Sequence, residues 1–442
     1  MNLNMGHHFL QDRESNAKTY TRSFNKVFIK GNLCQITDSE GKEYIDCLAC
    51  AGALPLGHNH PYIKQKIIDY LNSDGMQQAL DLATPAKIAF VESLYKMLPE
   101  SFASTAKIHF CGPTGADGVE AAIKLFKTHT GRHSILSFHG AYHGMTMGAL
   151  SLMGNLNAKT SLSGFTPEVQ ILPYPYTYRC PFGLGGEASE QTSLLYIRNC
   201  LSDPESGITK PAMIILEAIQ GEGGCIPASA KWLKGIRELA TEFDIPLVID
   251  EVQTGIGRTG NFLAHQIADI TPDAIVLSKA IGGSYPLSIL LYHEKYDSWH
   301  SGAHTGTFRG NQLALIAGKA TLDYINENNL LDHVNQVGSY LKHGLFTLKS
   351  KYPCIGDIRG RGLMLGAEIV DVSSTNKTPK GDGILAKAIK MACFANGLII
   401  ETGGRNSAVL RFLPPLVISE QEINQVLIRL EKSIIEVLNH NK

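Results

Sequence analysis

Residues 246–260 read PLVIDEVQTGIGRTG. The opening PLVID is a short, β-branched apolar run of the kind that predicts a buried strand, here ending at Asp250. Three glycines at positions 255, 257 and 260 then complete a literal G-x-G-x-x-G, the spacing of a dinucleotide-binding turn. The stretch leaves two hypotheses open. Either the glycines bind a dinucleotide, or Asp250, Glu251 and Gln253 serve another cofactor.

Four further runs in the middle of the chain have the same character as PLVID. They are KIHF (107–110), SILSF (134–138), AMIIL (212–216) and DAIVLS (273–278). Segments with helical spacing, such as SAKWLKGIRELATEF (229–243), lie between them. Strands that alternate with helices predict a parallel α/β sheet with helices on both faces.

The pattern changes after about residue 319. Two long amphipathic helices are predicted over roughly 311–327 and 331–349, and a small mixed unit follows that ends in the helix QEINQVLIRLEKSIIEVL. A chain of 442 residues is longer than one core usually serves. We therefore expect a large cofactor-binding domain over 76–318, a small domain over 319–442, and an N-terminal segment, 1–75, packed against the small domain.

Composition excludes several classes of partner. The 40 basic and 41 acidic side chains give a net charge of −1, which argues against a nucleic-acid or membrane-surface partner. No apolar run reaches the length of a membrane span, the N-terminus lacks the apolar core of a signal peptide, and 9 scattered cysteines suit a reducing compartment. We expect a cytoplasmic enzyme that acts on small molecules. Cys47 and Cys50 form one C-x-x-C without a second pair, so no metal site is expected.

The glycine motif lacks the context of a dinucleotide site. Such a site needs a helix that begins at the glycines and an acidic residue at the end of the next strand. Here RTGNFLAHQ follows without a clear helix start, and the next strand ends in Ser278 and Lys279. The hypothesis of a nicotinamide-dependent oxidoreductase is therefore disfavoured.

Asp250 and Lys279 end two strands of the same predicted parallel sheet, so their side chains should meet at its carboxyl edge. A lysine and a carboxylate suit pyridoxal 5′-phosphate, because the lysine can form a Schiff base and the carboxylate can hold the proton on the pyridine nitrogen. A simple salt bridge explains these two residues equally well, and other residues have to decide.

Three other segments supply what the phosphate and the ring of this cofactor require. CGPTGADGVEAAIKLFK (111–127) has a glycine-rich turn at the start of a helix, where Gly115 and Ala116 leave room for a phosphate. Tyr142 follows a predicted strand in GAYHGMT (140–146) and is placed to stack on the ring. Thr307, in HTGTFRGN (304–311), offers a hydroxyl group to the phosphate.

The order and spacing of eight blocks resemble one family across essentially the whole chain. The blocks are GHNHP, PTGADGVEAAIKL, GAYHGMT, EAIQGEGG, IDEVQTGIGRTG, LSKAIGG, GTFRGNQ and LRFLPPL. The family is that of the class III (ω-amino-acid) aminotransferases, which are fold type I pyridoxal-phosphate enzymes. The resemblance implies an α/β fold in which a mostly parallel seven-stranded sheet forms the large domain, beside a smaller α+β domain.

Finer features point to one branch of this family. RESNAKTYTR, GALPLGHNHP, GTFRGNQLA and GLIIETGGRN look like the diaminobutyrate–2-oxoglutarate aminotransferases. This resemblance implies transfer of the distal amino group of L-2,4-diaminobutyrate to 2-oxoglutarate. Ornithine, N-acetylornithine and 4-aminobutyrate are alternative donors, and an intramolecular aminomutase on the same fold is an alternative of another class.

The cofactor residues of the family match positions of this sequence one by one. Lys279 matches the Schiff-base lysine, which also carries the proton, and Asp250 matches the partner of the pyridinium nitrogen. The residues around the ring and the phosphate match Tyr142, Val252, Gln253, Gly115, Ala116 and Thr307. Since Thr307 matches a residue that reaches the phosphate across a dimer interface, the resemblance implies a homodimer with shared active sites.

Two more matches concern the substrate. Arg411 matches the arginine that binds the α-carboxylate of 2-oxoglutarate, and Glu222 matches the acid that pairs with this arginine while an ω-amino donor occupies the site. One position departs from the pattern. Met145 stands where enzymes acting on ornithine or 4-aminobutyrate usually carry a second carboxylate-binding arginine, and Arg405 or Arg309 would have to replace it.

Overall fold

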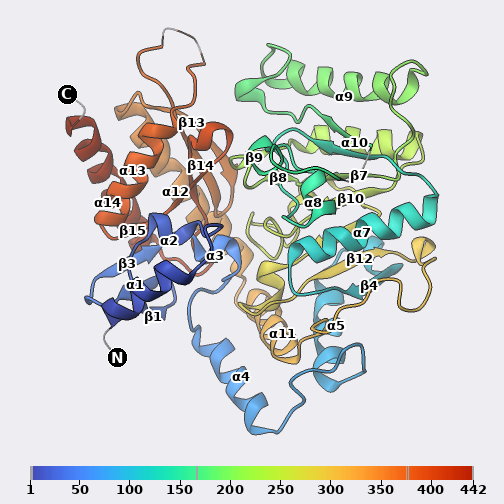
Figure 1. Cartoon of the computed structure of the whole chain (residues 1–442), viewed down its shortest axis with the longest axis horizontal. Helices are drawn as coiled ribbons and strands as arrows, with labels where there is room; N and C mark the ends of the chain where they lie inside the picture. The colour runs from blue at the N-terminus through green and yellow to red at the C-terminus, as the bar shows by residue number, and fades with distance from the viewer. Residues whose placement is uncertain (1–2, 166–167, 375, 377, 441–442) are drawn as a thin grey trace.

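A seven-stranded sheet forms the centre of the larger part of the molecule (Figure 1). The computed structural model describes residues 3–440 apart from 166, 167, 375 and 377, and the order of the sheet is β4-β12-β11-β10-β7-β5-β6. The strands are β4 (Ala106–Phe110), β5 (Ile135–Phe138), β6 (Val169–Leu172), β7 (Met213–Leu216), β10 (Leu247–Asp250), β11 (Ala274–Leu277) and β12 (Ile289–His293). All five strands predicted from apolar runs are present. β12 runs against β11 and β4 and the other strands are parallel, so the predicted mostly parallel sheet is confirmed.

Helices cover both faces of this sheet because its central strands are apolar on both sides. Every residue of β5, β7, β10 and β11 is buried. α7 (Gly115–Thr130) packs Val119 into the cluster that contains Val248, whereas α10 (Ala230–Glu242) packs Trp232 into the cluster that contains Leu247. Successive side chains of β10 thus enter opposite helical layers, and the strand delivers Asp250 at its end.

The beginning and the end of the chain meet in a second, smaller part of the molecule, on the left of Figure 1. β15 (Leu398–Ile399) pairs in parallel with β3 (Glu43–Asp46), beside β2 (Gln35–Asp38) and β1 (Phe28–Asn32). A further sheet has the order β13 (Ile355–Arg361), β14 (Met364–Ile369), β17 (Val409–Phe412), β16 (Glu401–Gly403). The domain boundaries at 75/76 and 318/319 stay a proposal. The pairing of β3 with β15 supports the packing of the N-terminal segment against the small domain, whereas one helix, Gln312–Glu327, runs across position 318/319.

Long helices accompany these sheets. α11 (Gln312–Glu327) and α12 (Leu330–Lys351) lie where the amphipathic pattern predicted them, and α13 (Gly383–Ala395) and α14 (Glu420–His440) follow. The other elements are α1 (Leu3–Arg13), α2 (Tyr20–Ser23), α3 (Ala49–Gly52), α4 (Pro61–Asn72), α5 (Pro85–Met97), α6 (Glu100–Ala103), α8 (Met147–Ser151), α9 (Gly186–Ser202), β8 (Ile219–Gln220), β9 (Ile226–Pro227) and short 3-10 turns that include η3 (Ala264–Ala268) and η4 (Lys279–Gly282). Within the described ranges, no helix is both long and apolar enough to cross a membrane.

The glycine-rich loop after β10 connects the two parts of the molecule. Arg258 is 2% exposed, and its Nη1 donates to the carbonyl oxygens of Leu363, at 3.2 Å, and Pro414. The Arg258 carbonyl oxygen in turn accepts the Leu363 N–H at 3.0 Å. Gly362 lies so close that a Cβ there would be 2.6 Å from the carbonyl carbon of Thr259. The glycines therefore shape an inter-sheet contact, and the next helical turn, η3, begins only at Ala264.

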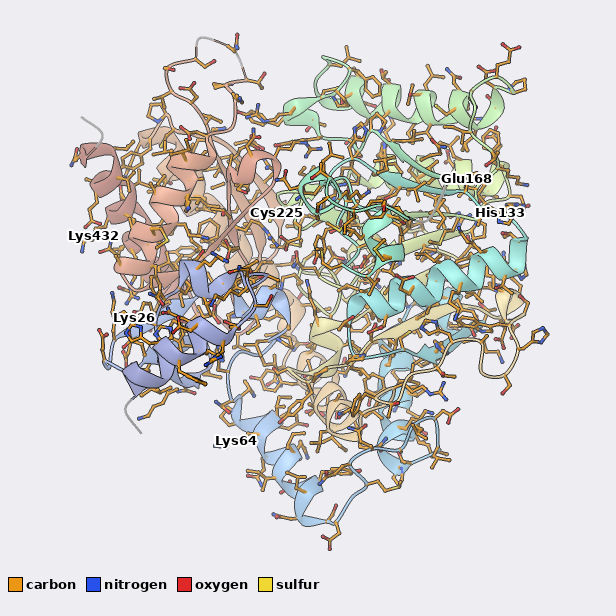
Figure 2. All side chains as sticks on the ribbon, viewed as in Figure 1. Lys26, Lys64, His133, Glu168, Cys225 and Lys432 are labelled. Atoms are coloured by element: carbon orange, nitrogen blue, oxygen red, sulfur yellow. The ribbon has the colours of Figure 1, made fainter. Side chains whose placement is uncertain are left out.

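Side chains fill the space between the two parts (Figure 2). Cys225, labelled near the middle of that view, is fully buried, and its Cβ would lie 3.1 Å from a Cβ added to Gly366 of β14. The smaller sheet thus packs directly onto the turn between β8 and β9, which also carries Glu222. Packing at this junction fixes the distance between the large sheet and the smaller one.

The replacement Gly362→Ala should destabilise the protein more than Gly131→Ala. Both glycines have positive φ, +53° and +65°. That conformation costs an L-residue roughly 1–2 kcal/mol. A Cβ at Gly131 meets nothing within 4 Å, whereas one at Gly362 meets the backbone of Thr259 and Arg258, and overpacking adds about 1–3 kcal/mol. Thermal melts of both variants check this, and equal shifts would show that the loop contact tolerates a methyl group.

Candidate active site

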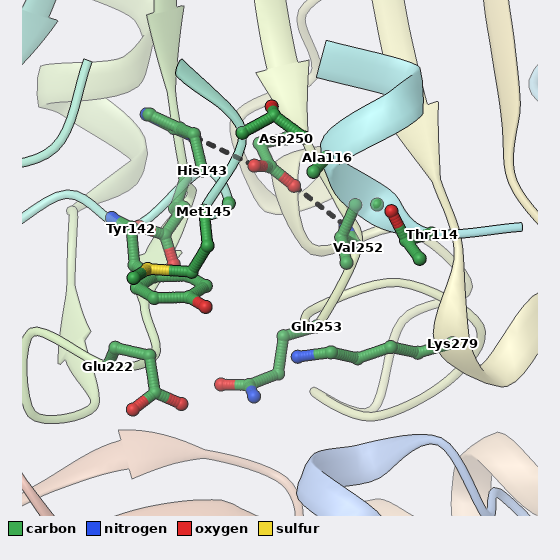
Figure 3. Close-up of a pocket in the computed structure, with 14 residues that line it drawn as sticks. Thr114, Ala116, Tyr142, His143, Met145, Glu222, Asp250, Val252, Gln253 and Lys279 are labelled. Atoms are coloured by element: carbon green, nitrogen blue, oxygen red, sulfur yellow. Dashed lines mark hydrogen bonds and ion pairs between the residues drawn. The ribbon is translucent and has the colours of Figure 1, made fainter. Parts of the chain in front are cut away.

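A pocket of about 470 Å³ lies at the carboxyl ends of the central strands (Figure 3). Its walls contain most of the residues expected from the sequence. The lining residues are Thr114, Gly115, Ala116, Tyr142, His143, Gly144, Met145, Thr146, Glu217, Glu222, Asp250, Val252, Gln253 and Lys279. The structure thus brings together residues from segments that are far apart in the chain.

The order of the strands explains this convergence. β11, β10, β7 and β5 are consecutive neighbours in the sheet, and the three pairings between them are parallel. Lys279 lies two residues beyond β11, Asp250 is the last residue of β10, Glu217 directly follows β7, and Tyr142 lies in the loop after β5. Because parallel strands end at one edge, four separate loops contribute to one pocket.

Asp250 is held by a hydrogen bond on each oxygen. Its Oδ1 accepts the Val252 N–H at 2.9 Å, and its Oδ2 lies 2.8 Å from Nδ1 of His143 (Figure 3). The carboxylate is only 4% exposed. An ionised carboxylate can only accept hydrogen bonds, so the imidazole Nδ1–H is the donor. Sequence reasoning missed His143, although it directly follows Tyr142.

Lys279 begins the turn η4 with a positive φ of 50°, a conformation uncommon for residues other than glycine. Burial lowers the pKa of its amine. The charges of Glu222, Asp250 and Glu217 raise this pKa and that of Arg411 lowers it. A lysine whose pKa is lowered carries more of the neutral, nucleophilic amine near neutral pH.

Glu217 joins two loops of the pocket. Its Oε1 accepts the Tyr142 N–H at 3.0 Å, and its Oε2 accepts the Gly221 N–H at 2.9 Å. Burial, with the nearby charge of Asp250, raises the pKa of this carboxyl group to about 7. Sequence reasoning missed Glu217, but the strand AMIIL ends immediately before it, which is the signal that identified Asp250.

The first turn of α7 forms the end of the pocket where a phosphate is expected. Thr114 caps this helix through a capping box with Asp117, and Gly115 and Ala116 open it. A Cβ on Gly115 would lie 2.8 Å from Cγ1 of Val252, so a larger residue would fill the space. The N–H groups and dipole of a helix N-terminus favour an anion at this place.

Glu222 lines another wall of the pocket and forms an ion pair with Arg411, which is not itself among the lining residues. Arg411 Nη1 lies 2.7 Å from Glu222 Oε1, and Arg411 Nη2 donates to Gln253 Oε1 at 3.0 Å. Although Arg411 is 2% exposed, Glu222 raises its pKa. Burial alone would raise the pKa of Glu222, but Arg411 and Lys279 lower it. Both groups are therefore charged, and the pair covers the guanidinium group.

Besides Arg411, three residues considered for phosphate or substrate binding are absent from the lining of this pocket. Thr307 is exposed on the loop before α11. Arg309 pairs with Asp81 Oδ2 at 2.9 Å, and the guanidinium carbon of Arg405 lies 4.8 Å from the ring centre of Tyr176. Met145 is at the pocket wall and 57% exposed. Neither arginine is among the described residues that line the pocket of its own chain beside Met145.

Comparison with known proteins agrees with this geometry. The chain is 49% identical over 418 residues to a diaminobutyrate–2-oxoglutarate aminotransferase of Rhizobium meliloti. The matching residues cover 94% of this chain and 89% of that protein. It is 46% identical to the Haemophilus influenzae protein of that name, with coverages of 98% and 96%.

Solved structures agree as well. An amine transaminase from an uncultivated Pseudomonas species, in its PLP-bound form, is 26% identical and superposes with a TM-score of 0.86 over 96% of this chain and 98% of that one. The family model for class-III aminotransferases matches residues 17–434. With a lysine, a carboxylate and an anion-binding helix start gathered in one pocket, this chain belongs to the class III aminotransferases.

Proposed function

We propose that this protein is a pyridoxal-phosphate-dependent aminotransferase that moves the distal amino group of L-2,4-diaminobutyrate to 2-oxoglutarate. The products are L-aspartate 4-semialdehyde and L-glutamate, and the reaction is reversible. The observation that carries the proposal is the ion pair between the buried Arg411 and Glu222, which lines the same pocket as Lys279 and Asp250. The names of the relatives at 49% and 46% identity support the choice of substrate.

The pocket fits the cofactor at each of its functional groups. The start of α7, at Gly115 and Ala116, would bind the phosphate, and Tyr142 and Val252 would enclose the ring. When bound, pyridoxal phosphate supplies an electron sink for the substrate carbon that loses a proton. Asp250 would hold the proton of the ring nitrogen. Lys279 would attach the cofactor and later move the proton at the substrate carbon, for which its lowered pKa suits it.

The ion pair solves a problem that the two substrates pose. Diaminobutyrate has to present its distal amine, whereas 2-oxoglutarate has to present the keto carbon beside its α-carboxylate. A free Arg411 would bind the α-carboxylate of diaminobutyrate and bring the wrong amine forward. While Glu222 covers Arg411, that binding mode is closed, and when Glu222 swings away the guanidinium can bind 2-oxoglutarate. A charge-assisted hydrogen bond of this kind contributes roughly 1.5–3 kcal/mol.

We propose further that the protein is a cytoplasmic homodimer. The exposed apolar side chains Met145 and Phe308, at 57% and 58%, support a covered surface near the pocket and the Thr307 loop. Thr307 lies outside the pocket of its own chain, as expected of a residue that reaches the phosphate of a partner. The nine cysteines are all free, which agrees with a reducing compartment.

The protein with its cofactor should form glutamate from L-2,4-diaminobutyrate and 2-oxoglutarate. Ornithine is one methylene longer, and one methylene changes kcat/KM by about 10- to 200-fold, so we expect a loss of this order with ornithine. Without 2-oxoglutarate, turnover should stop after one equivalent, whereas an aminomutase would continue. Borohydride reduction and peptide mapping should locate the pyridoxyl group on Lys279. Label on another lysine, or equal rates with ornithine, would contradict the proposal.

The charge balance around Lys279 predicts opposite effects of two replacements. In the cofactor-free protein, Glu222→Gln removes a negative charge that raises the pKa of Lys279. The same replacement releases Arg411, whose positive charge lowers the pKa of Lys279. The amine should therefore be neutral more often and acetylate faster at pH 8. Arg411→Met should slow the same labelling, because it removes a cation that lowers this pKa. Mass spectrometry measures both rates, with Glu401→Gln as control. Changes of the same sign in both variants would refute the electrostatic coupling.

The Arg411–Glu222 gate should separate the two half-reactions. Glu222→Ala leaves Arg411 exposed, so the half-reaction with diaminobutyrate should slow and that with the α-amine of glutamate should become easier. Arg411→Ala should impair the half-reaction with 2-oxoglutarate. Single-turnover absorbance, recorded for each half-reaction alone, tests both. If both variants slow both halves equally, the pair has only a structural role.

A further inference from the structure

Two buried side chains next to Asp250 have no role in the proposal so far. His143 and Glu217 line the same pocket as Asp250 and are 3% and 6% exposed. They come from the loops that follow β5 and β7, and β10 with Asp250 is the next strand in the sheet. Three neighbouring strand ends thus place one imidazole and two carboxyl groups together.

Stability alone does not explain His143. Its Nδ1 lies 2.8 Å from Asp250, but its Nε2 is buried without a hydrogen-bond partner in the described part of the chain. A buried polar atom without a partner costs free energy, commonly about 1–3 kcal/mol. In spite of this cost, the imidazole is oriented toward Asp250, as the dashed line between the two side chains in Figure 3 shows.

Glu217 fixes the backbone from which His143 projects. Its Oε1 accepts the N–H of Tyr142, the residue before His143, and its Oε2 accepts the N–H of Gly221 in the turn that carries Glu222. Both acceptors lie on one side chain that directly follows the buried strand β7. The position of the imidazole is therefore tied to the sheet itself.

We propose that His143 is a positioning residue for this reaction, which keeps the Asp250 carboxylate ionised and oriented toward the cofactor's ring nitrogen, and that Glu217 holds His143 in place. The inference rests on the proposed function. According to this inference, three side chains, Asp250, His143 and Glu217, together keep the proton on the ring nitrogen, and Asp250 does not do so alone.

The physical reason lies in the sharing of one proton. Between a buried carboxylate and a pyridine nitrogen, the proton can sit on the nitrogen, which leaves two charges, or on the oxygen, which leaves none. Low polarity favours the neutral arrangement, and each hydrogen bond donated to the carboxylate favours the charged one. Asp250 receives two such bonds, from Val252 and from His143. Without the second, the proton should move to Asp250, and the ring should lose its strength as an electron sink.

Three replacements of His143 test this. His143→Asn retains an N–H at the place of Nδ1, whereas His143→Gln displaces its amide and His143→Leu has no donor. The full-length protein is loaded with cofactor labelled with ¹⁵N in the ring, and NMR reports whether that nitrogen is protonated. We expect a protonated ring in the wild type and H143N, and an unprotonated ring in H143Q and H143L. Their kcat should fall by about 10- to 100-fold, the loss typical when the outer partner of a metal ligand is removed, with KM nearly unchanged.

Each alternative outcome has a distinct meaning. If the wild type binds the labelled cofactor and all variants keep its ring protonated, the inference about His143 is overturned and the proposed function stands. If the wild type binds no cofactor, the proposed function and the inference both fall. Should H143L not fold, H143Q alone decides, because its polar side chain is similar in size to histidine. A ring that loses its proton equally in H143N would also overturn the inference, since that variant keeps the donor.

Discussion

One buried cation determines how the two parts of this molecule meet. Arg258 is 2% exposed, and burial lowers its pKa to about 10. Its hydrogen bonds go to the carbonyl oxygens of Leu363 and Pro414 in the smaller part. A buried charge that loses its partners costs several kcal/mol, so the loop that begins after Asp250 stays against these two segments. Because Arg411 lies three residues before Pro414, the same contact sets the distance between Asp250 and Arg411.

The pocket that results is lined by three acids and by Lys279, and Arg411 pairs with one of the acids. The charges of Glu222, Asp250 and Glu217 raise the pKa of Lys279, and Arg411 and Lys279 lower the pKa of Glu222. Arg411 is paired with Glu222. Burial is the main influence on Lys279, and it lowers the pKa of the Lys279 amine. A transaminase needs this division, since one cation has to remain charged for a carboxylate and the other has to become a nucleophile.

The N-terminal segment completes the wall of the site. Gln253, which contacts Arg411, donates from Nε2 to the carbonyl oxygen of Ala51 at 3.0 Å. Ala51 and its neighbour Cys50 have positive φ angles of 59° and 49°. Such conformations persist where the surroundings fix them, and here the Leu413 N–H binds the carbonyl oxygen of Cys47 at 2.8 Å. Residues that are first in the sequence thus help to orient Gln253 and Arg411.

The sequence alone determined the elements and one essential convergence. Apolar runs such as PLVID predicted the central strands, and the rule that parallel strands end at one edge brought Asp250 and Lys279 together, as the structure shows. Such signals are local, because periodicity arises from backbone geometry within a few residues. The matches to a known family added Arg411 and Glu222, which local patterns do not connect. Tertiary structure decided the rest. His143 and Glu217 join Asp250 only through the order β10-β7-β5, and Arg258 finds its acceptors 105 and 156 residues away. A side chain's partner depends on which strands lie side by side, and that order is set by packing of the whole chain.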